Sequence, residues 1–206
     1  MTITSVEESK ANKMVRIFID HHYAFAIPQE DYIRNHLYEE GEITAGRLEH
    51  IRKDVLVRAA REKGVYYLTI RDRSEGQLLK KLTEAGFDED IARIAANELK
   101  GLGYLNDSRY AMRYLAGRIK TKALSQKALR YELAQKYIPA DIIETVFSEF
   151  EVDDEEVAFR AARKKFGKYD LDDEKVQGKV LNFLLHRGFS FDIGYKVLKL
   201  MKEERK

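Results

Sequence analysis

Residues able to perform acid–base, nucleophilic or metal chemistry are few and scattered along this chain. It has five histidines and no cysteine, so it offers no thiolate nucleophile, no disulfide framework and no cysteine-based zinc site. His21 and His22 are adjacent, but zinc needs about four ligands at suitable spacing, so a polar turn explains the pair better. The acidic residues between 170 and 174 lack the glycine and the spacing of a calcium loop. We expect no metal site and no cofactor.

Motifs that bind nucleotides or assemble a catalytic site are also missing. No Gly-x-x-x-x-Gly-Lys loop occurs, and Gly101-x-Gly103 continues into Tyr104-Leu105, which breaks the dinucleotide-binding pattern. The chain has neither His-Glu-x-x-His nor Gly-x-Ser-x-Gly. Because no catalytic set can be assembled, we predict a binding protein that is not an enzyme.

The arrangement of charges is the most informative chemical feature. The net charge is only +2, yet residues 107–137 hold eight basic and two acidic residues, and residues 139–156 hold eight acidic residues and no basic one. Such blocks can steer a charged partner, although ordinary solvated helix faces are the alternative explanation. The predicted binding residues, which would contact acidic groups of a protein partner or DNA phosphates, are Arg109, Arg113, Arg118, Lys120, Lys122, Lys127 and Arg130.

The elements that would position these side chains are repeated helices. Apolar residues at i, i+4 spacing recur in three segments at a constant offset of 51 residues, with Gly86, Tyr137 and Gly188 at the same central break. Each segment therefore predicts two short helices joined by a tight turn. Ser74 and Ser125 precede the first helix as N-caps, and Ser74 with Gln77 fits a capping box.

A further helix precedes each pair, which makes each repeat a three-helix unit. Tyr67-Leu68 matches Tyr114-Leu115 at an offset of only 47. The second repeat thus has four extra residues, which we expect to enlarge the connection between its first and second helices. Arg118, Lys120 and Lys122 would lie at the end of that first helix and in the enlarged connection.

The predicted fold is mainly α, with a short β-hairpin and helix before the repeats. Only two prolines occur in 206 residues, which favours helices over a turn-rich β fold. The runs Met14–Ile19 and Tyr23–Ile27 are β-prone, and Pro28 suits the start of a helix that continues through Leu37. The expected domains are a disordered tail (1–13), the hairpin and helix (14–53), and three-helix repeats at 54–104, 105–152 and 153–206.

The repeats resemble those of the RecX family, bacterial regulators of the RecA recombinase. The stretch Gly103-Tyr-Leu-Asn-Asp107 followed by Tyr110-Ala111 is the most specific match, and His186-Arg-Gly-Phe-Ser190 closes the third repeat. Asp72 departs from the family pattern, which often has proline there, and Tyr137 stands where glycine is usual. The resemblance extends from about residue 14 to the C-terminus.

This resemblance implies binding in the helical groove of the RecA–DNA filament. Such binding would restrain ATP hydrolysis, strand exchange and coprotease activity in recombination, DNA repair and the SOS response. The alternative is a sequence-independent DNA-binding protein made of helix-turn-helix-like units, which would bind single- or double-stranded DNA. The near-neutral total charge counts against it. A third alternative is a helical adaptor unconnected with nucleic acid.

The setting of the protein follows from its apolar pattern. No apolar run approaches the length of a membrane-spanning helix, and the polar first residues, Met1–Ser5, are not a signal peptide. We therefore expect a cytoplasmic monomer with no membrane contact.

Overall fold

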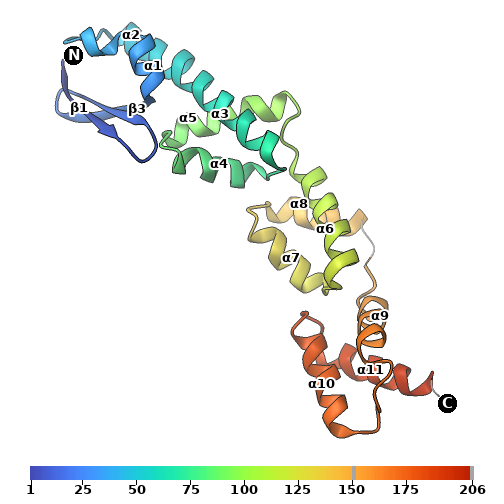
Figure 1. The fold of residues 1–206 in the computed structure, drawn as a ribbon. Coiled ribbons are helices and arrows are strands. Elements are labelled where there is room, and N and C mark those ends of the chain that lie inside the picture. The colour runs from blue at the N-terminus through green and yellow to red at the C-terminus, as the bar shows by residue number, and fades with distance from the viewer. Residues whose placement is uncertain (150–151, 205–206) are drawn as a thin grey trace. The chain divides into compact units, whose positions relative to one another are not determined.

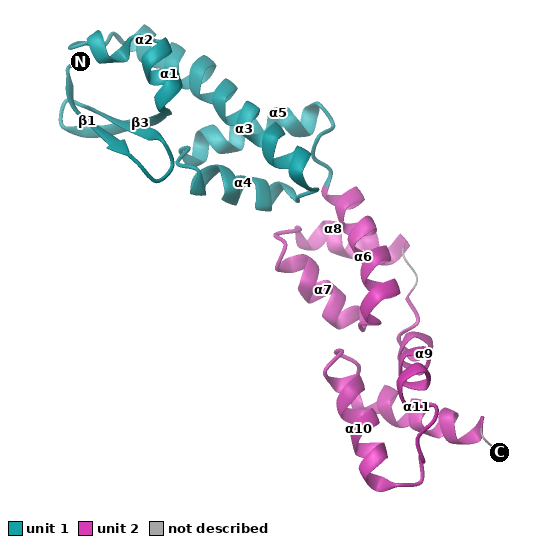
Figure 2. Ribbon diagram, in the orientation of Figure 1, with its two compact units in different colours: residues 1–106 teal, residues 107–206 magenta. Residues whose placement is uncertain are grey.

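The computed structural model describes residues 1–149 and 152–204, and it is mainly helical with a small sheet near the N-terminus (Figure 1). The chain divides into two compact units, one ending at Asn106 and the other beginning at Asp107 (Figure 2). None of the helices within the described residues is long and apolar enough to cross a membrane. The predicted fold class is confirmed, because three-helix repeats follow one another in tandem after the sheet.

The sheet has three antiparallel strands in the order β1-β2-β3, with bounds β1 Ile3–Ser9, β2 Met14–Ile19 and β3 His22–Pro28. The predicted hairpin of β2 and β3 is confirmed. The expectation of a disordered tail over residues 1–13 is wrong, since β1 pairs with β2 from Ile3 opposite Ile19 to Ser9 opposite Met14. Most β1 side chains are exposed. Its order therefore comes from backbone hydrogen bonds, which leave no hydrophobic signal in the sequence.

Short helical segments connect the sheet to the first repeat. They are α1 Gln29–Arg34, the 3-10 turn η1 Leu37–Glu39, α2 Ala45–His50 and the π-helical turn η2 Ile51–Leu56. Pro28 is the N-cap of α1, as its position predicted. The helix does not continue through Leu37, because it ends at Arg34 and His36 takes a left-handed backbone conformation.

Each repeat contains three helices. Their bounds are α3 Val57–Ile70, α4 Glu75–Glu84 and α5 Glu89–Gly101; α6 Asp107–Lys122, α7 Gln126–Ala134 and α8 Ala140–Glu149; and α9 Asp154–Phe166, α10 Glu174–Leu185 and α11 Phe191–Glu203. The predicted serine caps are confirmed: the side chain of Ser74 accepts from the Gln77 backbone N–H, and that of Ser125 accepts from Ala128. Ser74 and Gln77 also complete the predicted capping box.

The four extra residues of the second repeat lengthen helix α6 and do not enlarge the following connection. Helix α6 runs to Lys122, and Ala123–Ser125 alone separate it from α7. The expectation of an enlarged loop is therefore wrong, because residues 118–122 keep helical hydrogen bonding where α3 has already ended. The additional turn carries Lys120 and Lys122.

The tight turns between the last two helices of the repeats use a left-handed residue. Gly86 has φ +103° and Gly188 has φ +85°, and Tyr137 adopts φ +61° at the equivalent position. A Cβ at position 86 would lie 2.7 Å from Met14 Cγ in β2, whereas one at position 188 would lie 2.8 Å from Ala128 Cβ in α7. The sheet thus meets the turn of repeat 1 much as the start of α7 meets the turn of repeat 3.

The hydrophobic cores follow the same organisation. In the first unit one continuous core joins the sheet, the connecting helices and repeat 1. In the second unit, repeats 2 and 3 have separate core clusters, with Ala123 of the connection packed against that of repeat 3. Each repeat therefore buries a thin core and leans on its neighbour, which is the behaviour of a modular array.

Candidate partner-binding surface

The seven predicted binding residues occupy three different settings on α6 and α7. Arg118 and Arg130 form ion pairs within repeat 2. Arg109, Arg113 and Lys127 have exposed side chains. Lys120 and Lys122 line a cavity together with residues of repeat 3. The structure therefore does not gather the seven side chains into one patch.

Arg118 connects α6 to α7 through a hydrogen-bonded group with Tyr114 and Glu132. Its Nε donates to Glu132 Oε2 at 2.6 Å and to the Tyr114 hydroxyl at 2.9 Å, and Nη2 donates to Glu132 Oε1. The Tyr114 hydroxyl donates to Glu132 Oε2 at 2.7 Å. The side chains of Arg118 and Glu132 are only 25% and 24% exposed. This arginine is thus engaged in holding repeat 2 together.

The titration of this group reflects its surroundings. Burial alone would raise the pKa of Glu132, but the hydrogen bonds from Arg118 and Tyr114 outweigh burial and hold the pKa below its ordinary value. Burial, reinforced by the hydrogen bond to Glu132, raises the pKa of Tyr114 to about 12. Glu132 is therefore ionised and Tyr114 protonated across the neutral range.

Arg130 is held in a similar way between α7 and α8. Its guanidinium pairs with Glu144, and it lies 4.2 Å from the ring centroid of Phe147. Glu144 belongs to the acidic block, so the two oppositely charged blocks neutralise each other in part within repeat 2. Both ion pairs join residues 14 positions apart on neighbouring helices.

The cavity beside Lys120 and Lys122 lies between the end of α6 and the helices α9 and α10, and its volume is about 700 Å³. Six basic side chains line it, and no carboxylate occurs among the described residues of its lining. We call this set the basic cleft; it consists of Lys120, Lys122, Arg160, Lys164, Lys165 and Arg187. Ile119, Val157 and Phe183 supply apolar wall.

A second cavity of about 660 Å³ adjoins the basic cleft and shares Lys165, Phe183 and Arg187 with it. Its other lining residues are Phe166, Tyr169, Lys179, Asn182 and His186. The lining again contains lysine and arginine and, among the described residues, no acidic one, and it includes three aromatic rings, those of Phe166, Tyr169 and Phe183. Such a lining can hold anionic groups next to flat apolar ones.

Arg187 lines both cavities and is held by contacts with repeat 2 and with Phe183. Its Nη1 donates to the backbone carbonyl of Lys122 at 2.6 Å, and its own carbonyl accepts from the backbone N–H of Ser125 at 3.0 Å. Its guanidinium carbon lies 4.2 Å from the ring centroid of Phe183. The buried Nε has no hydrogen-bond partner among the described residues. A positive charge is thus held rigidly where repeats 2 and 3 meet.

The sequence prediction missed the contribution of repeat 3. Residues 160–168 contain five basic residues and no acidic one, which is a signal in the sequence. The acidic residues directly before them largely cancel this local charge. Arg160, Lys164 and Lys165 lie within this run, whereas Arg187 is distant in sequence. Only the fold brings Arg187 to Lys122.

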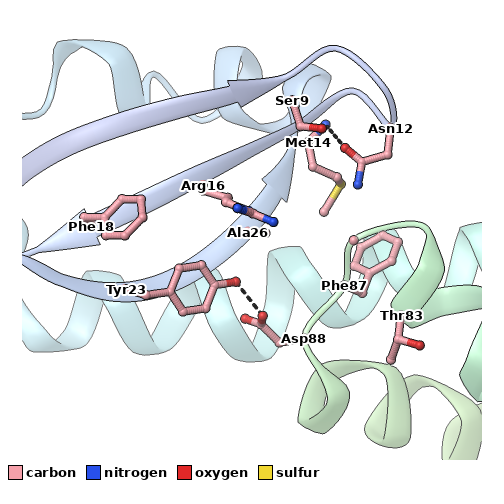
Figure 3. Close-up of a pocket in the computed structure, with 11 residues that line it drawn as sticks. Ser9, Asn12, Met14, Arg16, Phe18, Tyr23, Ala26, Thr83, Phe87 and Asp88 are labelled. Carbon is pink, nitrogen blue, oxygen red and sulfur yellow. Dashed lines mark hydrogen bonds between the residues drawn. The ribbon is translucent and has the colours of Figure 1, made fainter.

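A smaller cavity of about 470 Å³ occurs in the first unit, between the sheet and the turn after α4 (Figure 3). The Tyr23 hydroxyl donates to Asp88 Oδ1 at 2.5 Å across it. Burial, followed by the hydrogen bond to Asp88, raises the pKa of Tyr23. Arg52 also ties the sheet to repeat 1, donating to the Ala24 carbonyl and to Asp90. These contacts fix the sheet in place and offer no concentration of charge for a ligand.

Metal-binding clusters are not found in the part of the chain that the structure describes, since no three histidine or acidic side chains converge there. The basic side chains that line the two adjoining cavities of the second unit can bind anionic groups.

Comparison with known proteins assigns the repeats. Models of the first, second and third three-helix domains of RecX match residues 60–99, 106–146 and 153–198. The regulatory protein RecX of Clostridium botulinum strain Eklund 17B is 30% identical over 203 residues, covering 96% of this chain and 94% of that protein. This chain belongs to the RecX family. Clostridioides difficile RecX is similar at 29% identity, with 95% and 93% of the two chains covered.

Solved structures agree with this assignment. A crystal structure of regulatory protein RecX aligns with a TM-score of 0.64 at 26% identity, over 97% of this chain and 99% of that one. The RecX of Lactobacillus salivarius shares the fold, with a TM-score of 0.62 over 71% of this chain and 97% of that one. In terms of the RecX domains, the basic cleft lies between the second and the third, because α6 belongs to one and α9 and α10 to the other.

Proposed function

We propose that this chain regulates the RecA recombinase by binding the RecA filament on DNA, and that it mainly inhibits ATP hydrolysis, strand exchange and coprotease activity. Membership of the RecX family of regulatory proteins, through all three domains, is the observation that carries this proposal. A modular helical array offers a long contact surface, and its alternating charge suits a charged filament. The chain regulates without a catalytic site of its own.

We infer different roles for the seven binding residues that were predicted from the sequence. Arg118 and Arg130 maintain repeat 2 through their ion pairs, and Lys120 and Lys122 belong to the basic cleft. Arg109, Arg113 and Lys127 are exposed at other positions of α6 and α7. We assign them to steering and contact with acidic groups of RecA, where each desolvated charge-assisted contact contributes ~1.5–3 kcal/mol.

The test is a titration of RecA's single-stranded-DNA-dependent ATPase with this protein. Wild-type protein should lower hydrolysis at substoichiometric amounts, whereas the double variant Arg113→Glu with Lys127→Glu should require about tenfold more protein, a loss of ~1.4 kcal/mol. That difference should shrink as salt rises, because the attraction is screened. Lys175→Glu with Lys199→Glu changes the net charge equally at exposed positions of repeat 3 and serves as the control.

Three results would contradict the proposal. Unchanged hydrolysis up to a large excess of wild-type protein would exclude regulation of RecA by this chain. Inhibition by the double variant equal to that by the control would move the contact surface to other residues. Binding to bare DNA combined with no effect on RecA would instead favour the sequence-independent DNA-binding alternative.

A further inference from the structure

We propose that the basic cleft and the cavity next to it bind the backbone of a single-stranded nucleic acid. The inference does not depend on the proposed regulation of RecA, because it rests on the lining of the two cavities alone. Their lysines and arginines lie in or directly after α6, α9 and α10, and together they number seven: Lys120, Lys122, Arg160, Lys164, Lys165, Lys179 and Arg187.

Several lysines around the two cavities are not neutralised by neighbouring acids within the described residues. Elsewhere in repeat 3, basic residues pair with acids, as Lys196 does with Glu155 and Arg163 with Glu204. Within the basic cleft, Arg160 pairs with Glu156. Lys120, Lys164 and Lys165 have no salt bridge within the described residues. Concentrated like charges repel one another and destabilise a fold. Their presence around one concavity therefore points to a ligand that carries several negative charges.

Aromatic rings between the charges indicate the kind of polyanion. Phe183 stands at the boundary of the two cavities, with Lys165 Nζ at 4.4 Å and the Arg187 guanidinium carbon at 4.2 Å from its ring centroid. Tyr169 lines the second cavity with an exposed ring. Single-stranded nucleic acids bind where basic residues follow the phosphates and aromatic rings stack on bases. A purely acidic peptide has no group that would use these rings.

The shape of the site distinguishes a single strand from a duplex. A protein that reads base edges in a double helix inserts a convex element, an α-helix or a β-ribbon, into the major groove. Here the basic side chains line concavities, and the two cavities of about 700 and 660 Å³ adjoin at Phe183. A flexible single strand can pass through adjoining concavities, placing phosphates on lysines on both sides of the ring. We therefore infer a preference for single strands.

The position of the site adds a structural consequence. Residues of both repeats line the basic cleft, and Arg187 of repeat 3 is bonded to the Lys122 carbonyl of repeat 2. A strand bound there would contact both repeats at once and so stabilise their junction.

The experiment measures binding of the full chain, without recombinase, to a fluorescein-labelled oligothymidylate by anisotropy over a range of salt concentrations. Lys164→Glu with Lys165→Glu should weaken binding at least tenfold at low salt. The slope of log affinity against log salt should fall by about 1.4, since each lost phosphate contact on a single strand accounts for about 0.7. The control, Lys175→Glu with Lys199→Glu, has the same net charge and alters neither cavity.

Further arms exclude the competing explanations. Lys164→Gln with Lys165→Gln should weaken binding in the same direction, with an unchanged thermal melt. An unlabelled duplex should compete less well than an unlabelled single strand, and polyglutamate of equal charge should compete poorly. Equal affinities of the cleft variant and the control variant would overturn the proposal. So would equal competition by polyglutamate, which would identify a site for acidic peptides, or equal competition by the duplex.

Discussion

Repeats 2 and 3 both carry many basic side chains but use them differently. In repeat 2, Arg118 and Arg130 pair with Glu132 and Glu144 on the next helix of the same repeat. In repeat 3, Lys164 and Lys165 line cavities whose described residues include no carboxylate. A similar local charge therefore stabilises one repeat and leaves the other prepared for an anionic ligand.

The difference follows from where the acids lie. Helices α7 and α8 present carboxylates 14 residues beyond the arginines of repeat 2, so that the tight helical turns bring each pair together. In repeat 3 the described acids lie before and in the first turn of α9, between residues 170 and 174, and in and just after α11, and none of them lines the two cavities. The last turn of α9 holds Arg163, Lys164 and Lys165. A dense run of basic residues in a sequence thus indicates a binding surface only once the positions in the fold of the acids that could neutralise it are known.

The strongest test of this comparison breaks the contact between the two repeats. Gly188→Ala should destabilise the second unit by about 3 kcal/mol, because alanine is strained at φ +85° and its Cβ would lie 2.6 Å from Ser125 Oγ and 2.8 Å from Ala128 Cβ. Chemical denaturation followed by circular dichroism measures the loss. If the binding site depends on the contact between the turn at Gly188 and the start of α7, the variant should also lose binding of the oligothymidylate.

Gly178→Ala is the matched control for that substitution. Gly178 lies inside α10 with open space around it, so alanine should stabilise the helix by about 0.5–1 kcal/mol. Equal stabilities of the two variants would show that the turn at residue 188 is not a tight contact.

The outcome of the sequence predictions follows the same division between local and distant interactions. The repeats, the serine caps and the tight turns at Gly86 and Gly188 were predictable, because each depends on residues within a few positions of one another. Strand β1 was not, since an exposed edge strand has no apolar alternation. The ion pairs of Arg118 and Arg130 were missed because they depend on how neighbouring helices are placed. Arg187 was missed because it reaches Lys122 across 65 residues.

A smaller effect should separate the two kinds of basic residue directly. Arg118→Met should destabilise the protein by about 2 kcal/mol, between the values for exposed and fully buried pairs, because it leaves the carboxylate of Glu132 without its main partner in a largely buried position. Lys164→Met removes an exposed charge of repeat 3 that forms no salt bridge among the described residues, and it should change stability by less than about 0.5 kcal/mol. Urea denaturation of both variants measures the contrast. Equal losses would mean that the basic residues of repeats 2 and 3 do not differ in role.

The smallest expected effect is a dependence on pH that belongs to repeat 2 alone. Because the pKa of Glu132 is lower in the folded protein than in the unfolded chain, its contribution to stability is complete above the unfolded pKa and is lost as the pH falls through the folded pKa. Glu132→Gln should therefore be less stable than wild type by about 1 kcal/mol at pH 7. The difference should shrink below about pH 4.5, near the ordinary carboxyl value, as the wild-type carboxylate becomes protonated.

The same pair of proteins tests the alkaline side. Tyr114, whose pKa is raised to about 12 beside Glu132, favours the folded state while it is protonated, so wild-type stability should decline as the pH rises from about 10 towards 12. Removing the negative charge and acceptor at position 132 should weaken that decline. Urea midpoints of wild type and Glu132→Gln at pH 3, 7 and 10.5 give the three differences. A difference that stayed constant from pH 7 to pH 3 would show that the Arg118–Glu132 pair does not stabilise repeat 2, and its arginine would then be available to a partner as the lysines of repeat 3 are.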